Sequence, residues 1–131
     1  MIEPHVRRIA EAERVDGPPT PGMRRFQAVA SDRMWAGGAQ TEPGMVSAWH
    51  HHGDHDSAIY VVSGALRMEF GPGGAEAFEA GPGDFVFIPR GAIHREGNPL
   101  DVPADIVVVR AGSGESVFNV DGPEPGPSPA G

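Results

Sequence analysis

Glycine and proline divide this chain into short pieces and so limit what it can fold into. Its 131 residues include 19 glycines and 14 prolines, which separate short apolar runs such as 85–88 and 106–109. Proline interrupts helices and central strands, and glycine favours tight turns. After residue 15 no helical periodicity of useful length remains, whereas about eight short segments have the character of strands. The sequence therefore predicts an all-β domain of the sandwich, jelly-roll or small-barrel type.

A chain of this length fits one domain with a real core. We expect an N-terminal arm and proline-rich loop over residues 1–22, a barrel over 23–120 and a disordered Gly/Pro-rich tail over 121–131. Residues 6–9 could form an edge strand or part of a short helix. Residues 31–44 are expected to be irregular and 45–52 extended. The remaining predicted strands are 24–30, 57–63, 65–70, 75–80, 84–88, 106–110 and 116–120.

Composition excludes several classes of function. The chain has 18 acidic and 10 basic residues, a net charge of -8 and no basic stripe, which argues against a nucleic-acid partner. All ten basic residues are arginine and cysteine is absent, so disulfides, thiolate ligands and lysine Schiff bases are excluded. No apolar run is long enough to span a bilayer, and no secretory signal is recognisable. We therefore expect a cytoplasmic protein without a membrane partner.

A histidine-rich tract is the strongest chemical signal. Four of the six histidines lie within residues 50–55. Imidazole is the commonest protein metal ligand, and a strand places residues i and i+2 on one face. His50 and His52 can therefore point at one ion while His51 points away. A solvated loop, buried structural histidines or a tag remnant are the alternatives, although tags lie at chain ends. We take a metal site as the first hypothesis.

A metal site needs donors from more than one hairpin, and the only histidine further along the chain is His94. The residues around both places form two motifs with fixed spacing. The first contains Gly44, His50, His52 and Gly64, and the second contains Gly83, Pro89, Gly91, His94 and Asn98. In this pair of motifs the chain resembles the cupin family. The resemblance implies a double-stranded β-helix, a jelly-roll barrel in whose interior His50, His52 and His94 can converge.

The chain departs from the family pattern at one ligand position. Where the motif has glutamate this sequence has Ser57, whose hydroxyl stays protonated at neutral pH and is a poor ligand. His55 or Asp56 could compensate, or water could complete a three-histidine site. We expect His55, so the predicted metal ligands are His50, His52, His55 and His94. Nitrogen-rich coordination suits one divalent transition metal, Fe, Cu, Ni, Zn or Mn.

The resemblance also implies a range of functions. We expect a metal-dependent enzyme that acts on a small oxygenated organic substrate, most simply a dioxygenase, with isomerase or decarboxylase chemistry as further options. The alternative is a non-catalytic cupin that binds a small ligand or a metal, for example as a sensor. A homodimer is expected by resemblance.

Aromatic residues and arginines are the candidates for contacts with a substrate. Trp35, beside Gly37 and Gly38, could line a pocket mouth, although core packing is the usual role of a lone tryptophan. Three arginines could clamp a carboxylate of a substrate: Arg67, Arg95 and Arg110. A surface role is the stronger interpretation for each of them. The candidate residues for the pocket wall are Trp49, Tyr60, Met68 and Phe87. Residues of these types more often pack in a core than line a pocket.

Overall fold

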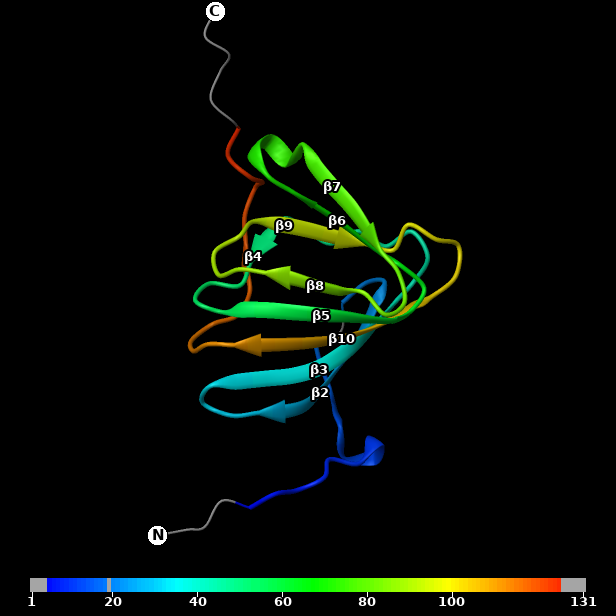
Figure 1. Cartoon of the computed structure of the whole chain (residues 1–131), viewed down its shortest axis with the longest axis vertical. Coiled ribbons are helices and arrows are strands. Elements are labelled where there is room, and N and C mark those ends of the chain that lie inside the picture. The colour runs from blue at the N-terminus through cyan, green and yellow to red at the C-terminus, as the bar shows by residue number, and fades with distance from the viewer. Residues whose placement is uncertain (1–4, 19, 126–131) are drawn as a thin grey trace, which may run out of the picture.

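The computed structural model describes residues 5–18 and 20–125, which form two antiparallel sheets (Figure 1). In spatial order the larger sheet contains β1 (Val15–Asp16), β2 (Met23–Ala30), β3 (Met34–Thr41), β10 (Ala104–Ala111), β5 (Asp56–Ser63) and β8 (Phe85–Ile88). The smaller sheet contains β11 (Phe118–Asn119), β4 (His50–His51), β9 (His94–Gly97), β6 (Leu66–Phe70) and β7 (Glu76–Ala80). Two short 3-10 helices, η1 (Glu11–Glu13) and η2 (Pro72–Gly74), complete the elements. This confirms the predicted all-β class.

The two sheets enclose one apolar core. Alternate residues of β5 and β10 point inward, as the two-residue period of a strand requires, and they meet inward residues of β6 and β8. The buried core residues are Ala39, Ile59, Val61, Leu66, Met68, Ala80, Val86, Ile88, Ile106 and Val108. The same inward rows end in polar residues, Ser57 on β5 and Arg110 on β10. One end of the barrel interior is therefore polar.

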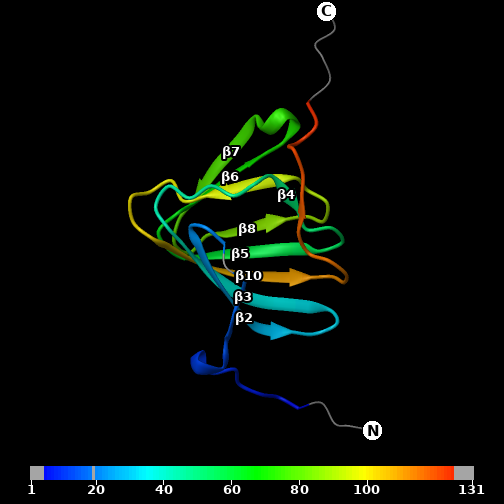
Figure 2. The same cartoon turned by 180° about the vertical axis from the view of Figure 1, so that it is seen from behind.

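Segments that are distant in sequence lie side by side in both sheets. β10 lies between β3 and β5 (Figure 1), so the last long strand joins the two halves of the larger sheet. In the smaller sheet β4 pairs with β9, and His50 is the register partner of His94. The view from behind shows β4 beside the C-terminal segment (Figure 2), which supplies β11. This topology agrees with a double-stranded β-helix and brings the two histidine-bearing segments together.

The expectation of an irregular segment over residues 31–44 is wrong, because β3 occupies Met34–Thr41 in the middle of the larger sheet. Gly37 and Gly38, which suggested flexibility, serve close packing instead. A Cβ atom at Gly37 would lie 2.6 Å from Cη2 of Trp35, and one at Gly38 would lie 2.6 Å from Cζ of Phe26. The glycines therefore make room for two aromatic rings. The extended segment 45–52 contains only the two-residue strand β4.

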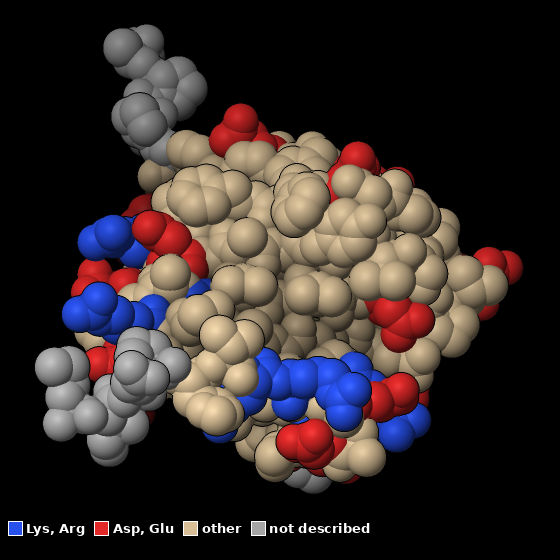
Figure 3. Space-filling model, turned by 60° about the horizontal axis from the view of Figure 1, so that its bottom comes forward, with Lys and Arg blue, Asp and Glu red and all other residues tan. Residues whose placement is uncertain are grey.

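The ends of the chain contribute little regular structure. Residues 6–9 belong to no helix or strand, and η1 follows them. The predicted tail falls partly on residues 126–131, which lie outside the described residues, and residues 121–125 contain no helix or strand. No described helix has the length and apolar character needed to cross a bilayer. On the face shown in Figure 3, basic side chains form a row beside a hollow, with acidic side chains next to it.

Candidate metal centre

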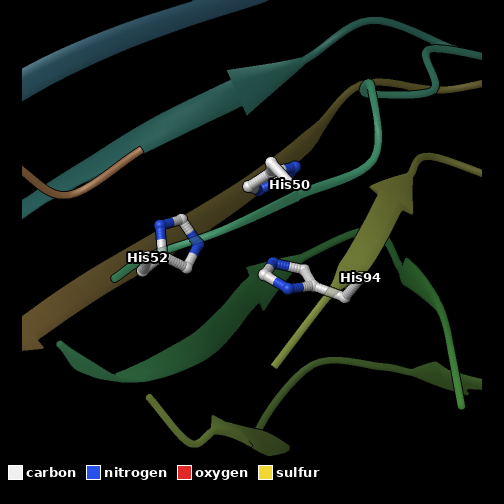
Figure 4. A group of neighbouring side chains, drawn as sticks. All are labelled: His50, His52 and His94. Atoms are coloured by element: carbon white, nitrogen blue, oxygen red, sulfur yellow. The ribbon is translucent and has the colours of Figure 1, made fainter. Parts of the chain in front are cut away.

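Three histidines from two chain segments converge inside the barrel. His50 lies on β4, His52 directly follows that strand and His94 begins β9, and their rings face a common centre (Figure 4). One ligand nitrogen from each lies within 4.8 Å of the others. The three residues are 7%, 5% and 2% exposed. The structure thus assembles three of the four histidines predicted as ligands.

Backbone carbonyl groups orient each of these rings. Nδ1 of His50 lies 2.8 Å from the carbonyl oxygen of Ala48. Nδ1 of His52 lies 2.6 Å from the carbonyl oxygen of Ser116, and Nδ1 of His94 lies 2.9 Å from that of Ala92. A carbonyl oxygen only accepts hydrogen bonds, so each Nδ1 carries the proton and each Nε2 presents a lone pair. Such a second hydrogen bond is what fixes the tautomer and ring orientation of metal-binding histidines.

Burial keeps two of these histidines, His52 and His94, neutral and able to bind a cation. It lowers the pKa of His52 to about 3, despite the opposing hydrogen bond to the Ser116 carbonyl. Burial also lowers the pKa of His94, an effect that the negative charge of Glu96 partly opposes. Both imidazoles are therefore deprotonated at neutral pH, as metal ligation requires.

Glu96 supplies a carboxylate that the sequence interpretation missed. Its Oε1 lies 3.8 Å from Nε2 of His50, and its Oε2 lies 3.8 Å from Nε2 of His94. These distances are too long for hydrogen bonds. Oε2 of Glu96 and Nε2 of His94 are both buried without a hydrogen-bond partner among the described residues. The missed signal is spacing: Glu96 stands two residues after His94 on β9, so both side chains face the same side.

The orphaned atoms fit a metal ion. Two ligands on opposite sides of an ion, each about 2.1 Å from it, are about 4.2 Å apart, and the separations between Glu96 and the two histidines are shorter. An ion between them would satisfy buried polar atoms that otherwise cost free energy. The donor set of three imidazoles and one carboxylate suits Fe, Mn, Ni, Cu or Zn rather than Mg or Ca.

The two residues expected to replace the family glutamate lie elsewhere. His55 is buried, but it is outside the converging group, and its Nδ1 lies 3.1 Å from the carbonyl oxygen of His52. Asp56 accepts a hydrogen bond of 2.9 Å from the backbone N–H of Arg90, and this contact is the main reason why the pKa of its carboxyl is lowered. Ser57 is buried, and its hydroxyl has no partner among the described residues. Glu96 is not a member of the three-histidine group either, but among the described residues its carboxylate lies within 4.0 Å of two of these histidines, which makes it the best placed of the four candidates.

His51 points away from the group, as the alternation of a strand requires. Its ring stacks on Phe118 of β11, with centroids 5.0 Å apart and planes 12° from parallel. Its Nδ1 accepts a hydrogen bond of 3.1 Å from the backbone N–H of Gly53. This residue is therefore a matched control for its two neighbours.

A cavity of about 690 Å³ opens beside the histidines. This volume is in the range of small-molecule sites. Its wall contains His50, His52, Glu96, Trp35, Phe26, Gln27, Arg25 and Arg110. The lone Trp35 is therefore a cavity residue as well as a neighbour of the core.

None of the four expected pocket-wall residues belongs to the described lining of this cavity. Tyr60 lies between inward residues of β5, so it points outward and packs on Phe85. Phe87 points outward for the same reason and is 67% exposed. Met68 belongs to the core, and Trp49 packs against Arg95. Strand alternation decides the outcome for Tyr60 and Phe87.

Comparison with known proteins identifies the fold family. The sequence model of the cupin domain matches residues 39–110. None of the curated proteins compared with the sequence matches it significantly. The matched residues include β5, β10 up to residue 110 and all three converging histidines.

Solved structures show the same fold. KdgF from Halomonas sp. has a TM-score of 0.68 and 23% identity, and the alignment covers 79% of this chain and 92% of that protein. The polyketide cyclase RemF from Streptomyces resistomycificus has a TM-score of 0.71 and 22% identity, with 88% and 86% covered. Bacillus subtilis oxalate decarboxylase, a protein with Mn(II) centres, has a TM-score of 0.68 and 21% identity, with 78% and 29% covered. The two-sheet fold, the paired histidine motifs and the match to the family model together show that this chain belongs to the cupin family.

Proposed function

We propose that this protein is a metal-dependent enzyme in which His50, His52, His94 and Glu96 hold one divalent transition metal next to a substrate cavity. One observation carries the proposal: buried nitrogen atoms of His50, His52 and His94 face one point, and Nε2 of His94 and the neighbouring Oε2 of Glu96 have no protein partner among the described residues. His55, the fourth ligand expected from the sequence, has no part in this proposal, because its Nδ1 faces the carbonyl oxygen of His52 and it is outside the three-histidine group, whereas Glu96 lies 3.8 Å from two of these histidines.

Oxygen chemistry on a small oxygenated organic substrate is the reaction class that we favour. Two histidines and one carboxylate with open positions are typical of non-haem Fe(II) oxygenases, and His52 adds a further nitrogen here. When bound, such an ion polarises a substrate oxygen or takes part in oxidation. The protein residues hold the donors in one tautomer, exclude water through burial and present Trp35 and Phe26 to an organic substrate.

A second candidate is a reaction without oxidation, such as cyclisation or decarboxylation. Two proteins of similar fold favour it, since one is named a polyketide cyclase and the other an oxalate decarboxylase. In such a reaction the ion would act as a Lewis acid. A protein that binds its ligand without turnover, for example a sensor, remains the non-catalytic alternative.

Metal analysis followed by turnover assays separates these functions. Purified protein is reconstituted with Fe(II), Mn(II), Ni(II), Cu(II) or Zn(II), and bound metal is measured by mass spectrometry. Oxygen consumption is then followed over catechols, diketones, flavonoids and thiols, and each substrate is also monitored without oxygen. Oxygen-dependent turnover supports a dioxygenase, turnover without oxygen supports the second candidate, and metal-loaded protein without turnover supports a binder.

The matched variants are His94→Ala and His51→Ala. The first removes a donor of the converging group and should abolish metal binding, whereas the second changes a histidine of the same tract that stacks on Phe118. Absence of bound metal in the reconstituted wild-type protein, or its retention in His94→Ala, would contradict the proposed centre.

A further inference from the structure

Two arginines share the cavity with the histidine group. Arg25 lies on β2 and Arg110 on β10, and both belong to the cavity wall together with His50, His52 and Glu96. Nε of each arginine is buried and has no hydrogen-bond partner among the described residues. A buried guanidinium donor without an acceptor costs free energy unless something binds it.

Carboxylates of the protein do not neutralise these two arginines. In the described part of the chain, no carboxylate oxygen lies within the 4.0 Å of an ion pair from either of them. The surface arginines Arg90 and Arg95, in contrast, have such partners. Burial lowers the pKa of Arg110, the charge of Arg25 lowers it further, and the charge of Glu96 opposes the shift. Arg25, Arg110 and Glu96 therefore interact within one cavity. Its lining also contains Asp16, so the two arginines share the cavity with two carboxylates but form an ion pair with neither.

Neighbouring side chains hold both guanidinium groups in place. Arg110 lies over the ring of Trp35, 5.0 Å from its centroid, and Nε1 of Trp35 donates a hydrogen bond of 2.9 Å to Oε1 of Gln27. Nη2 of Arg25 donates a hydrogen bond of 2.6 Å to Oγ1 of Thr20. A stacked guanidinium keeps its planar N–H edge available, and an edge fixed in advance loses little entropy on binding.

We propose that Arg110 and Arg25 form an anion subsite that holds a carboxylate group of a small organic acid beside the histidine–glutamate group. The inference rests on the proposed function for its place in catalysis and names the substrate class. The planar fork of arginine matches a carboxylate with two parallel hydrogen bonds. Glu96 and Asp16 each contribute a negative charge to the same cavity, which favours a singly charged carboxylate over a doubly charged phosphate. Phe26 and Trp35 would contact the organic part of the acid.

Tryptophan fluorescence gives a direct test, because Trp35 contacts the subsite. The chain has two tryptophans, and Trp49→Phe leaves Trp35 as the single reporter. This protein, freed of metal with a chelator, is titrated with benzoate, with its neutral analogue benzamide and with inorganic phosphate. We expect saturable binding of benzoate, weaker binding of phosphate and no binding of benzamide. Equal binding of benzamide, tighter binding of phosphate or no saturable benzoate signal would overturn the assignment.

Variants locate the effect. Arg110→Gln should weaken benzoate binding by about tenfold or more, whereas Arg90→Gln, on the surface, should leave it unchanged. Unchanged affinity in Arg110→Gln overturns the assignment. Circular dichroism checks the fold of each variant, and if Arg110→Gln is unfolded, Arg110→Lys takes its place, because it retains the charge but not the fork. Benzoate affinity equal to wild type in Arg110→Lys would equally overturn it.

Different experiments test the anion subsite and the proposed metal centre, so one can be contradicted while the other holds. Benzoate binding to the metal-free protein tests the arginines alone, and metal uptake and turnover test the centre. Metal uptake by Arg110→Gln should equal that of the wild type, because Arg110 is outside the ligand group. Benzoate binding without any metal uptake would preserve the subsite and contradict the centre.

Discussion

Ser57 and Arg110 are register partners on neighbouring strands, β5 and β10, and both belong to inward-facing rows. Ser57 stands where the cupin motif has glutamate. A glutamate there would face the guanidinium group of Arg110 and neutralise it. The serine leaves this guanidinium free, and the carboxylate nearest to the histidines comes instead from Glu96 on the opposite sheet. Relative to the family motif, the carboxylate has changed sheets.

Restoring the carboxylate at this position should therefore impair the arginine subsite. We expect Ser57→Glu to weaken benzoate binding by about tenfold, because the new carboxylate pairs with Arg110. Ser57→Ala is the matched control. It removes a buried hydroxyl without a described partner, so the free energy of unfolding should change by less than about 1 kcal/mol and bound metal should stay constant. Loss of metal in Ser57→Ala would show that the serine is a ligand after all.

Glu96 and His55 compete for the role of fourth ligand, and two variants compare them. Glu96→Gln should lower metal affinity by about tenfold or more, because it removes the only carboxylate near the histidines in the described structure. Nδ1 of His55 faces the carbonyl oxygen of His52, and His55→Asn keeps a nitrogen near that position. This variant should therefore leave the metal affinity unchanged. Competition with a fluorescent chelator measures both affinities. The reverse result would restore the four-histidine site.

Asp56 should stabilise the fold in a pH-dependent way without affecting metal. Hydrogen bonds from Arg90 hold the pKa of its carboxyl below the usual 3.8. The stabilisation is therefore complete above that value and disappears as the pH falls through the lowered pKa of the folded state. Asp56→Asn should be less stable than the wild type in urea at neutral pH, and the gap should close in acid. A constant gap, or lost metal, would contradict this role.

Gly37 makes room for the tryptophan that supports Arg110. We expect Gly37→Ala to lower the free energy of unfolding by about 1–3 kcal/mol and to shift the emission of Trp35, because the added methyl group would collide with the backbone carbonyl oxygen of Phe26 and with that ring. Gly81→Ala, at a position with open space around the added atom, should have little effect. Equal stability of the two variants, measured by thermal unfolding, would show that the backbone of β2 at Phe26 and the ring of Trp35 both move without cost.

The homodimer expected from the family resemblance remains a prediction. The outer surface of β8 is the place to test it, since Phe85 and Phe87 are 75% and 67% exposed there. Exposed aromatic rings on a sheet face are typical of an interface. Light scattering should give twice the chain mass of 13.8 kDa for the wild type and the single mass for Phe87→Ser. A monomeric wild type would remove the expectation.

The sequence by itself determined the fold class, the family and the three converging histidines. These features depend on which residues are close together along the chain. Glycine and proline mark the turns, and the spacing of His50 and His52 places both side chains on one face of an extended segment. Motif spacing also identified His94. The irregular segment predicted around Gly37 was wrong because glycine signals flexibility in sequence, whereas here it admits an aromatic ring.

Only the tertiary structure decided which charged groups accompany the histidines. Glu96 stands two residues after His94, but this spacing matters only because the chain continues as strand β9 toward the interior. Arg110 resembled a surface arginine until the register of β10 against β5 and β3 placed it between Ser57 and Trp35. Local sequence sets the alternation of side chains along a strand, but which face is inside and which residues oppose each other depend on pairing between distant strands.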